Sequence, residues 1–335
     1  MLRVFTRLLM IAVLLGGLVL GAGVWWLHSP MTLNLPVGSP VLDLEIEPGT
    51  RAAQVAETVV ASGAQTRVQL LQLWFRASGQ ARQIKAGSYE ITPGTTPRSL
   101  LTMLVRGDQS LKSITLVEGW SFRQVRAALL KAELLAHDSI GLEPEMIMEK
   151  LGKPGIHPEG RFFPDTYTYA KGSSDLAILK RAAKAMDKRL EAAWAMRNPD
   201  TPLKSPEQAL TLASIVEKET GKPSDRGQIA GVFTNRLRIG MLLQTDPTVI
   251  YGMGDKFGGN IRKRDLQLDT PYNTYTRGGL PPTPIAMPGK AALMAAVQPA
   301  PTKALYFVAR GDGTSQFSAT LDDHNRAVNK YIRGQ

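Results

Sequence analysis

The segment LASIVEKET, residues 212–220, places Glu217 and Glu219 in a run that otherwise has the apolar composition of a buried helix. Burial disfavours the charged form of a carboxyl group and raises its pKa, which suits a glutamate to act as a general acid. A buried carboxylate can equally be structural when an arginine pairs with it. The candidate arginines in the following segment are Arg226, Arg236 and Arg238. We expect one glutamate to be catalytic and one structural, and the spacing does not say which.

The ends of this helix are marked in the sequence. Ser205 is a predicted N-cap, Pro206 suits the first helical position and Gln208 completes a capping box. Gly221 and Pro223 are predicted to end the helix.

A helical wheel separates the two glutamates. Residues two positions apart differ by about 200° around the axis, so Glu217 and Glu219 cannot flank one bond as a pair. Both fall outside the predicted polar face. That face consists of Glu207, Thr211, Ser214 and Lys218.

The sequence lacks the residues that other kinds of catalytic site require. The chain has no cysteine, which excludes a thiolate nucleophile and a Cys-based zinc site. The motifs H-E-x-x-H, G-x-S-x-G, S-x-x-K and G-x-x-x-x-G-K-[ST] are missing, and the four histidines are scattered. We therefore expect carboxylate acid/base chemistry with no metal and no cofactor.

The N-terminus predicts export. Residues 8–27 contain no charged side chain and are long enough to cross a membrane as a helix. Arg3 and Arg7 precede this span and acidic residues follow it, which predicts a cytoplasmic N-terminus, with Trp25 and Trp26 at the outer interface. The alternative is a signal peptide cleaved near Gly21 or Gly23.

The length of the chain indicates the number of domains, and its net charge limits the classes of partner. The 335 residues, 43% of them hydrophobic, suggest about two domains. The net charge of +11 favours nucleic acid, anionic lipid or an acidic wall polymer as a partner. Nucleic acid is disfavoured by the predicted span and by the lack of a clustered basic tract.

A weak internal repeat predicts strand-turn-helix units. Its three copies are LEIEPGTRAAQVAETVV, YEITPGTTPRSLLTMLV and ITLVEGWSFRQVRAALL, and Thr50 is the predicted N-cap in the first. Such units suit a sugar-binding module, but we favour a plain α+β scaffold, because analogy at the level of the fold is a weak argument for function.

The rest of the chain combines helices with long loops. Residues 176–196 have a helical apolar pattern, and the aromatic cluster in PEGRFFPDTYTY, residues 158–169, is predicted to be core. Residues 268–289 are too rich in Pro and Gly for a regular element, and a loop of this length is usually functional. Gly311-Asp312-Gly313 predicts a hairpin turn.

Several segments together resemble the endolytic murein transglycosylase family (MltG, YceG-like). They are SIVEKETG, NRLRIGMLLQTDPTVIYG, YNTYTRGGLPP, YFVARGDG and a terminal HN, in order across residues 205–325. EGRFFPDTY and a LysM-like segment near residues 43–118 precede them. Thr283 and Met287 depart from the pattern, because we expect glycine and a polar residue there.

The resemblance implies a function. Members cleave the bond between N-acetylmuramic acid and N-acetylglucosamine within peptidoglycan strands and leave a 1,6-anhydro end, with the residue that aligns with Glu217 as catalyst. For Glu219 we expect a hydrogen bond that holds the helix or the next loop, or a substrate contact. The remaining candidates for sugar binding are Gln244, Asp246, Tyr272, Asn273 and Tyr275.

The expected organisation is an α+β protein anchored in the bacterial inner membrane, with a periplasmic catalytic domain. Its expected parts are a cytoplasmic N-terminus (1–7), a transmembrane helix (8–27), a linker (28–42), a LysM-like module (43–120) and a mixed α/β catalytic domain (121–335). The expected partners are glycan strands and peptidoglycan synthases (penicillin-binding proteins). The alternative is a non-catalytic wall-binding anchor for a synthase.

Overall fold

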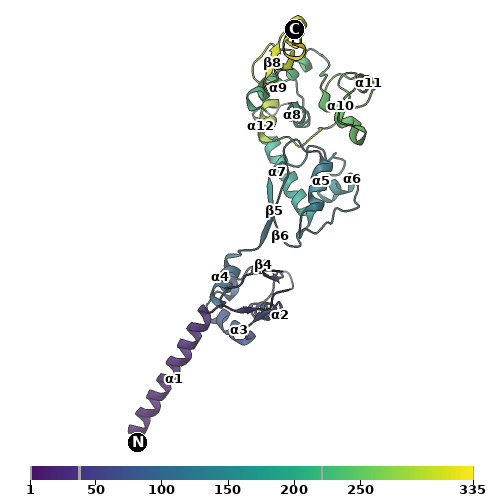
Figure 1. Ribbon diagram of the computed structural model, residues 1–335. Helices are drawn as coiled ribbons and strands as arrows, with labels where there is room; N and C mark the ends of the chain where they lie inside the picture. Colours follow the sequence, from purple (N-terminus) through teal and green to yellow (C-terminus); the bar gives the residue numbers. More distant parts are fainter. Residues whose placement is uncertain (1, 37–38, 220–221, 335) are drawn as a thin grey trace. The chain divides into compact units, whose positions relative to one another are not determined.

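The structure is a computed structural model of the chain (Figure 1). It describes all residues except 1, 37–38, 220–221 and 335, and all side chains except those of residues 1–8, 12 and the same gaps. The predicted position of Gly221 as a helix end lies outside the described residues. The fold is mixed α+β and divides into two compact units, residues 1–112 and 113–335.

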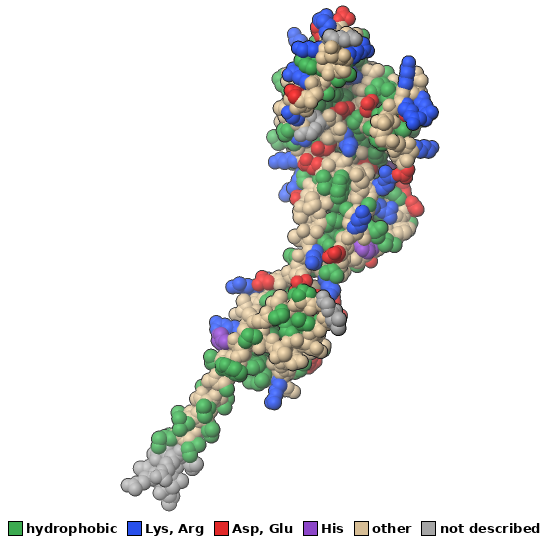
Figure 2. Space-filling model, in the orientation of Figure 1, with side chains coloured by type: hydrophobic (Ala, Val, Ile, Leu, Met, Phe, Trp, Pro, Cys, Tyr) green, Lys and Arg blue, Asp and Glu red, His purple; other side chains and the backbone are tan. Residues whose placement is uncertain are grey.

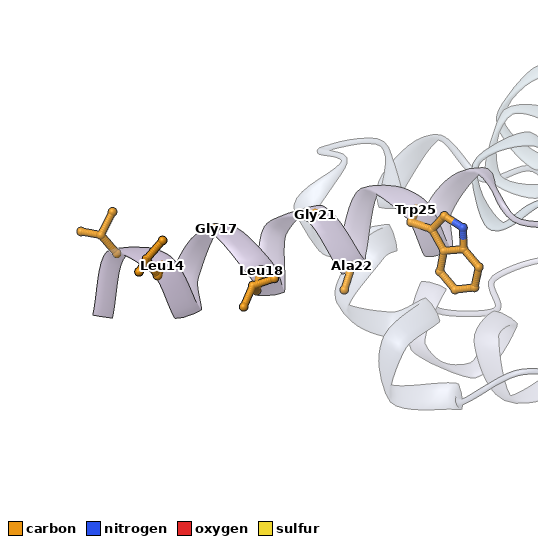
Figure 3. Close-up of a pocket in the computed structure, with 7 residues that line it drawn as sticks. Leu14, Gly17, Leu18, Gly21, Ala22 and Trp25 are labelled. Atoms are coloured by element: carbon orange, nitrogen blue, oxygen red, sulfur yellow. The ribbon is translucent and has the colours of Figure 1, made fainter. Parts of the chain in front are cut away.

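The first unit begins with the long helix α1, Leu2–His28. Its segment Leu9–His28 is apolar, is mostly exposed where its side chains are described and is long enough to cross a membrane (Figure 2). Leu14, Leu18 and Trp25 lie along one apolar side of this helix (Figure 3). This length and composition are consistent with a single-pass membrane anchor.

The described part of the first unit after α1 packs three helices on two short antiparallel ribbons. The strand β2 (Leu42–Ile46) pairs with β4 (Gly87–Ile91), and β1 (Thr32–Leu33) pairs with β3 (Ala64–Gln65). Along β2 the side chains alternate between buried and exposed, as expected for a strand with one face on a core. The helices are α2 (Ala52–Ala61), α3 (Val68–Ala77) and α4 (Pro97–Arg106), with the 3-10 turn η1 (Ala81–Gln83).

All three repeat segments form a strand, a turn and a helix. The first two are β2-α2 and β4-α4, whereas the third, β5 (Leu111–Thr115) followed by α5 (Phe122–Lys131), runs into the second unit. The predicted N-cap of α2 is wrong by one residue. Arg51 is the cap, because the Thr50 hydroxyl donates to the Glu47 carbonyl (2.8 Å) in the preceding turn.

The second unit joins a small sheet to a helical body. The strand β5 pairs with β6 (Thr166–Ala170), and α5, α6 (Pro144–Lys150) and part of α7 (Asp175–Ala195) share a core with them. The remaining helices are α8 (Pro206–Glu219), α9 (Pro223–Arg238), α10 (Asp246–Met253), α11 (Lys263–Gln267), α12 (Lys290–Val297) and α13 (Leu321–Val328). The 3-10 turn η2 (Gly254–Lys256) follows α10, and the π-helical turn η3 (Asn329–Arg333) follows α13.

Helix α8 is the centre of this body, packed against α7, α9, α10 and α12 (Figure 1). Every residue from Ala209 to Val216 is buried. Of the predicted polar face of α8, Glu207 and Lys218 are exposed, whereas the two residues between them are not. Thr211 and Ser214 are buried, and the Ser214 hydroxyl donates to the Thr211 carbonyl (2.7 Å) while accepting from the Ile285 amide (3.0 Å).

Two further local predictions are confirmed. The aromatic side chains of PEGRFFPDTYTY are core, with Phe162 fully buried and stacked on Phe122 at 5.2 Å between ring centroids. The turn at Gly311-Asp312-Gly313 joins β7 (Tyr306–Ala309) to β8 (Ser315–Ser318) in an antiparallel hairpin.

Candidate active site

The carboxyl group of Glu217 is enclosed near the end of α8. Its side chain is only 7% exposed, and its Oε2 accepts a hydrogen bond from the Gly289 amide at 2.9 Å. Its Oε1 lies 3.7 Å from Nη2 of Arg226 on α9. The helix thus holds one carboxyl group between an amide donor and a half-buried arginine.

The surroundings of Glu217 favour its protonated form. Burial raises the pKa of this carboxyl group, and the negative charge of Glu118 raises it further. The Gly289 hydrogen bond and the positive charges of Arg226 and Lys218 lower it, but the net direction is upward. A glutamate with a raised pKa can donate a proton near neutral pH and accept one afterwards.

The carboxyl group of Glu219 makes a different contact, with Thr245. Its Oε1 accepts a hydrogen bond from the Thr245 hydroxyl. Burial raises the pKa of Glu219, with a further rise from Asp246, while the Thr245 bond and Arg236 lower it. The carboxyl group ties α8 to the segment that leads into α10.

This segment carries two of the predicted sugar-binding residues. Gln244 is exposed and has φ of 48°, a left-handed conformation that is uncommon for residues other than glycine. The backbone amide of Gln244 donates to the Thr274 carbonyl (3.0 Å), and the Tyr275 hydroxyl donates to Asp246 (2.5 Å). Gln244, Asp246 and Tyr275 are therefore brought together.

Asn273 has a different environment. It is 1% exposed, and its amide nitrogen donates to the carbonyls of Leu266 (3.0 Å) and Leu268 (2.7 Å) while its oxygen accepts from the Tyr275 amide (2.9 Å). These bonds hold the loop that presents Tyr275, so a direct sugar contact from Asn273 would require the loop to open.

A cavity of about 670 Å³ lies beside α8. Tyr272 lines it, with its hydroxyl bonded to the Thr283 hydroxyl (2.8 Å) and its ring edge-on to Tyr251 at 4.9 Å between centroids. Thr283, a departure from the family pattern, thus fixes Tyr272. The other polar or charged lining residues are Ser121, Arg123, Gln124, Glu159 and Lys218. This volume is that of a small-ligand pocket.

Two further carboxyl groups lie near this site and are not predicted from the sequence. Glu159 is 3% exposed, accepts hydrogen bonds from the Phe122 amide (3.0 Å) and the Tyr251 hydroxyl (3.1 Å), and burial raises its pKa to about 7. Glu118 lies against Gly289. The signal for Glu118 was in the repeat, where it replaces the proline of the other two turns at Pro48 and Pro93.

The described part of the chain contains no set of side chains arranged to bind a metal ion. Among those residues, no group of three or more His, Cys, Asp or Glu side chains is placed to hold an ion.

Comparisons with known proteins agree with this architecture. The model of the YceG-like family matches residues 44–330. An endolytic murein transglycosylase of Bacillus subtilis is 31% identical over 309 residues, which is 87% of this chain and 85% of that protein. One from Streptococcus pneumoniae is 28% identical over 75% of this chain and 51% of its own length.

A solved structure is also similar. The crystal structure of a YceG-like protein from Listeria monocytogenes has a TM-score of 0.54 and 28% identity, and covers 86% of this chain and 98% of its own. The family match spans most of the chain, from the first strand-turn-helix unit to the C-terminal helix α13. The chain belongs to the YceG-like family.

Proposed function

We propose that this chain is an endolytic peptidoglycan lytic transglycosylase with Glu217 as its catalytic acid and base. The relatives from Bacillus subtilis and Streptococcus pneumoniae are named endolytic murein transglycosylases. The observation that carries the proposal is the enclosed carboxyl group of Glu217, held by the Gly289 amide and directly next in sequence to Lys218 at the cavity.

The proposed reaction needs one carboxyl group. Protonated Glu217 gives its proton to the glycosidic oxygen as the bond to the anomeric carbon of N-acetylmuramic acid breaks. The resulting carboxylate takes the proton of the 6-hydroxyl as this oxygen bonds to the anomeric carbon, which closes the 1,6-anhydro ring. No water is consumed, and the nucleophile is already positioned within the substrate. Two-carboxylate glycosidases differ in needing a second group to activate water or form a covalent intermediate.

The sugars are proposed to bind along the cavity and the Gln244–Asp246 segment. Tyr272 offers an aromatic face, while Gln244, Asp246 and Tyr275 offer exposed or half-buried polar groups. Glu219 and Asn273 support this surface through the Thr245 and loop hydrogen bonds. The left-handed backbone of Gln244 supports a functional role, because strained residues persist where function needs them.

The proposed setting is the bacterial inner membrane. Arg3 and Arg7 before the apolar helix would keep the N-terminus cytoplasmic and the catalytic domain periplasmic. Residues 43–120 would act as a LysM-like glycan-binding module and a penicillin-binding synthase as partner. A reporter active only in the periplasm and fused after residue 335 should be active, whereas an inactive fusion would reverse the orientation.

Digestion tests the activity. Full-length protein in detergent, incubated with purified insoluble peptidoglycan, should release soluble glycan fragments. Tight binding to the polymer with no release would instead identify a non-catalytic wall anchor.

A further inference from the structure

The third repeat turn has a residue that its turn geometry does not require. The glycines of the three turns, Gly49, Gly94 and Gly119, all have left-handed φ values of 85°, 96° and 77°. The first two turns place proline before this glycine, and the third places Glu118 there. A glutamate is not needed to make the turn, so its side chain needs another explanation.

The third turn is hydrogen-bonded to the loop before α12, which contains Gly289 and so binds Glu217. The Gly119 amide donates to the Met287 carbonyl (2.8 Å), and the Met287 amide donates to the Trp120 carbonyl (2.7 Å). Lys218 also donates from Nζ to the Gly119 carbonyl (3.3 Å). Met287, the second departure from the family pattern, is fully buried in this junction.

Glu118 and Glu217 converge on one glycine. A Cβ added at Gly289 would overlap the Glu118 carboxylate, so this carboxylate lies directly against the Gly289 backbone. The amide of the same glycine donates to Glu217 at 2.9 Å. One residue therefore separates an exposed carboxylate from an enclosed carboxyl group.

The charges that act on Glu217 come from three directions. Arg226 on α9 and Lys218 on α8 are positive, and Glu118 from the turn before α5 is negative. The negative charge of Glu118 raises the pKa of Glu217, in opposition to these two positive charges. Without it, burial alone would favour the acid form of Glu217, because both remaining neighbouring charges favour the carboxylate, which cannot donate a proton.

We propose that Glu118 is a positioning residue for the reaction, whose negative charge beside Gly289 favours the acid form of Glu217 before the glycosidic bond breaks. This rests on the proposed function. Glu118 is placed to act through Glu217, and its own contact with sugar is not required. Two observations support this role. Glu118 stands where the other two turns have proline, and its carboxylate lies against Gly289, whose amide binds Glu217.

The pH profile of activity is the test, measured with the full chain in detergent on purified glycan strands. Glu118→Gln removes the negative charge and keeps the side-chain size, so deprotonation of Glu217 becomes easier. The alkaline limb of the profile should move to lower pH by about one unit or less, as for one partly solvated like charge. Activity on the acidic side of that limb should stay within a few-fold of the parent enzyme.

A second variant moves the charge without removing it. Gly289 has φ of −79°, which alanine adopts freely, so Gly289→Ala should displace the flexible Glu118 carboxylate and keep the amide donor to Glu217. The alkaline limb of the pH profile of Gly289→Ala should also move to lower pH, by less than that of Glu118→Gln. The control Glu149→Gln, an exposed carboxylate in the same unit, should leave the profile in place.

Failure of this inference can be told from failure of the proposed function. An unshifted alkaline limb in Glu118→Gln, or a loss equal at every pH, would overturn the role of Glu118 while the parent enzyme still cuts glycan. A parent enzyme that releases no glycan would overturn the proposed function itself.

Discussion

Glu217 and Glu219, two positions apart on α8, make hydrogen bonds to different parts of the second unit. Glu217 accepts from the amide of Gly289, at the start of α12, and Glu219 accepts from the hydroxyl of Thr245, before α10. The angle between successive helical positions forces this divergence, since two positions correspond to about 200°. One carboxyl group therefore faces the proposed chemistry, and the other holds a proposed sugar-binding segment.

Isosteric substitution should separate these two roles. Glu217→Gln keeps the side-chain volume but cannot donate an acidic proton or accept one back, so the rate should fall by about 10²- to 10⁴-fold or more with little change in melting temperature. Glu219→Gln keeps an acceptor for Thr245 and should retain most activity. Rates of glycan release and thermal melting of both variants check this. An active Glu217→Gln with an inactive Glu219→Gln would show that the roles are reversed.

Arg226 should shift the pH profile in the direction opposite to Glu118. Its guanidinium lies 3.7 Å from Glu217 and lowers the pKa of that carboxyl group. Arg226→Gln removes the positive charge, the pKa rises, and the alkaline limb of glycan release should move to higher pH. Arg238→Gln, on the same helix but bonded to the Asp200 carbonyl, is the matched control. A shift toward acid in Arg226→Gln would contradict this assignment.

The local features of this site could be predicted from sequence, and its long-range contacts could not. Helical periodicity placed both glutamates of α8 in buried surroundings, and Pro206 marked the helix start. Gly289 and Ile285 bind α8 across 72 and 71 residues of sequence, a distance that no periodic pattern spans. The burial of Ser214 in the polar face could not be predicted for the same reason, because the Ile285 amide that satisfies its hydroxyl comes from a distant segment.

Glu159 should make stability depend on pH. Its folded-state pKa of about 7 lies above the ordinary 4.5, so its stabilising contribution is fully present below about pH 4.5 and is lost as the pH rises through 7. Relative to Glu159→Gln, which does not titrate, the parent protein should lose about 3 kcal/mol across this window. Melting temperatures of both proteins at several pH values measure the change, with exposed Glu149→Gln as control. A pH-independent difference would show that Glu159 does not titrate there.

Relief of the backbone strain at Gln244 should increase stability and weaken substrate binding. Gln244→Gly relieves the cost of φ at 48° and should raise stability by up to about 1 kcal/mol, while loss of the side chain weakens glycan binding and raises KM. Leu134→Gly is the matched control, because Leu134 is exposed with φ of 59° and lies outside the cavity lining. It should leave KM unchanged. An unaltered KM in Gln244→Gly would remove Gln244 from the proposed sugar site.

The mass of the new glycan ends is the most direct test of the proposed single-carboxyl mechanism. Intact strands are digested by the full-length protein and the products are measured by mass spectrometry, with Glu217→Gln as the blank. Attack by the 6-hydroxyl predicts 1,6-anhydro ends, which are one water lighter than reducing ends. Products that carry reducing ends would show that water is the nucleophile and would contradict the proposed mechanism.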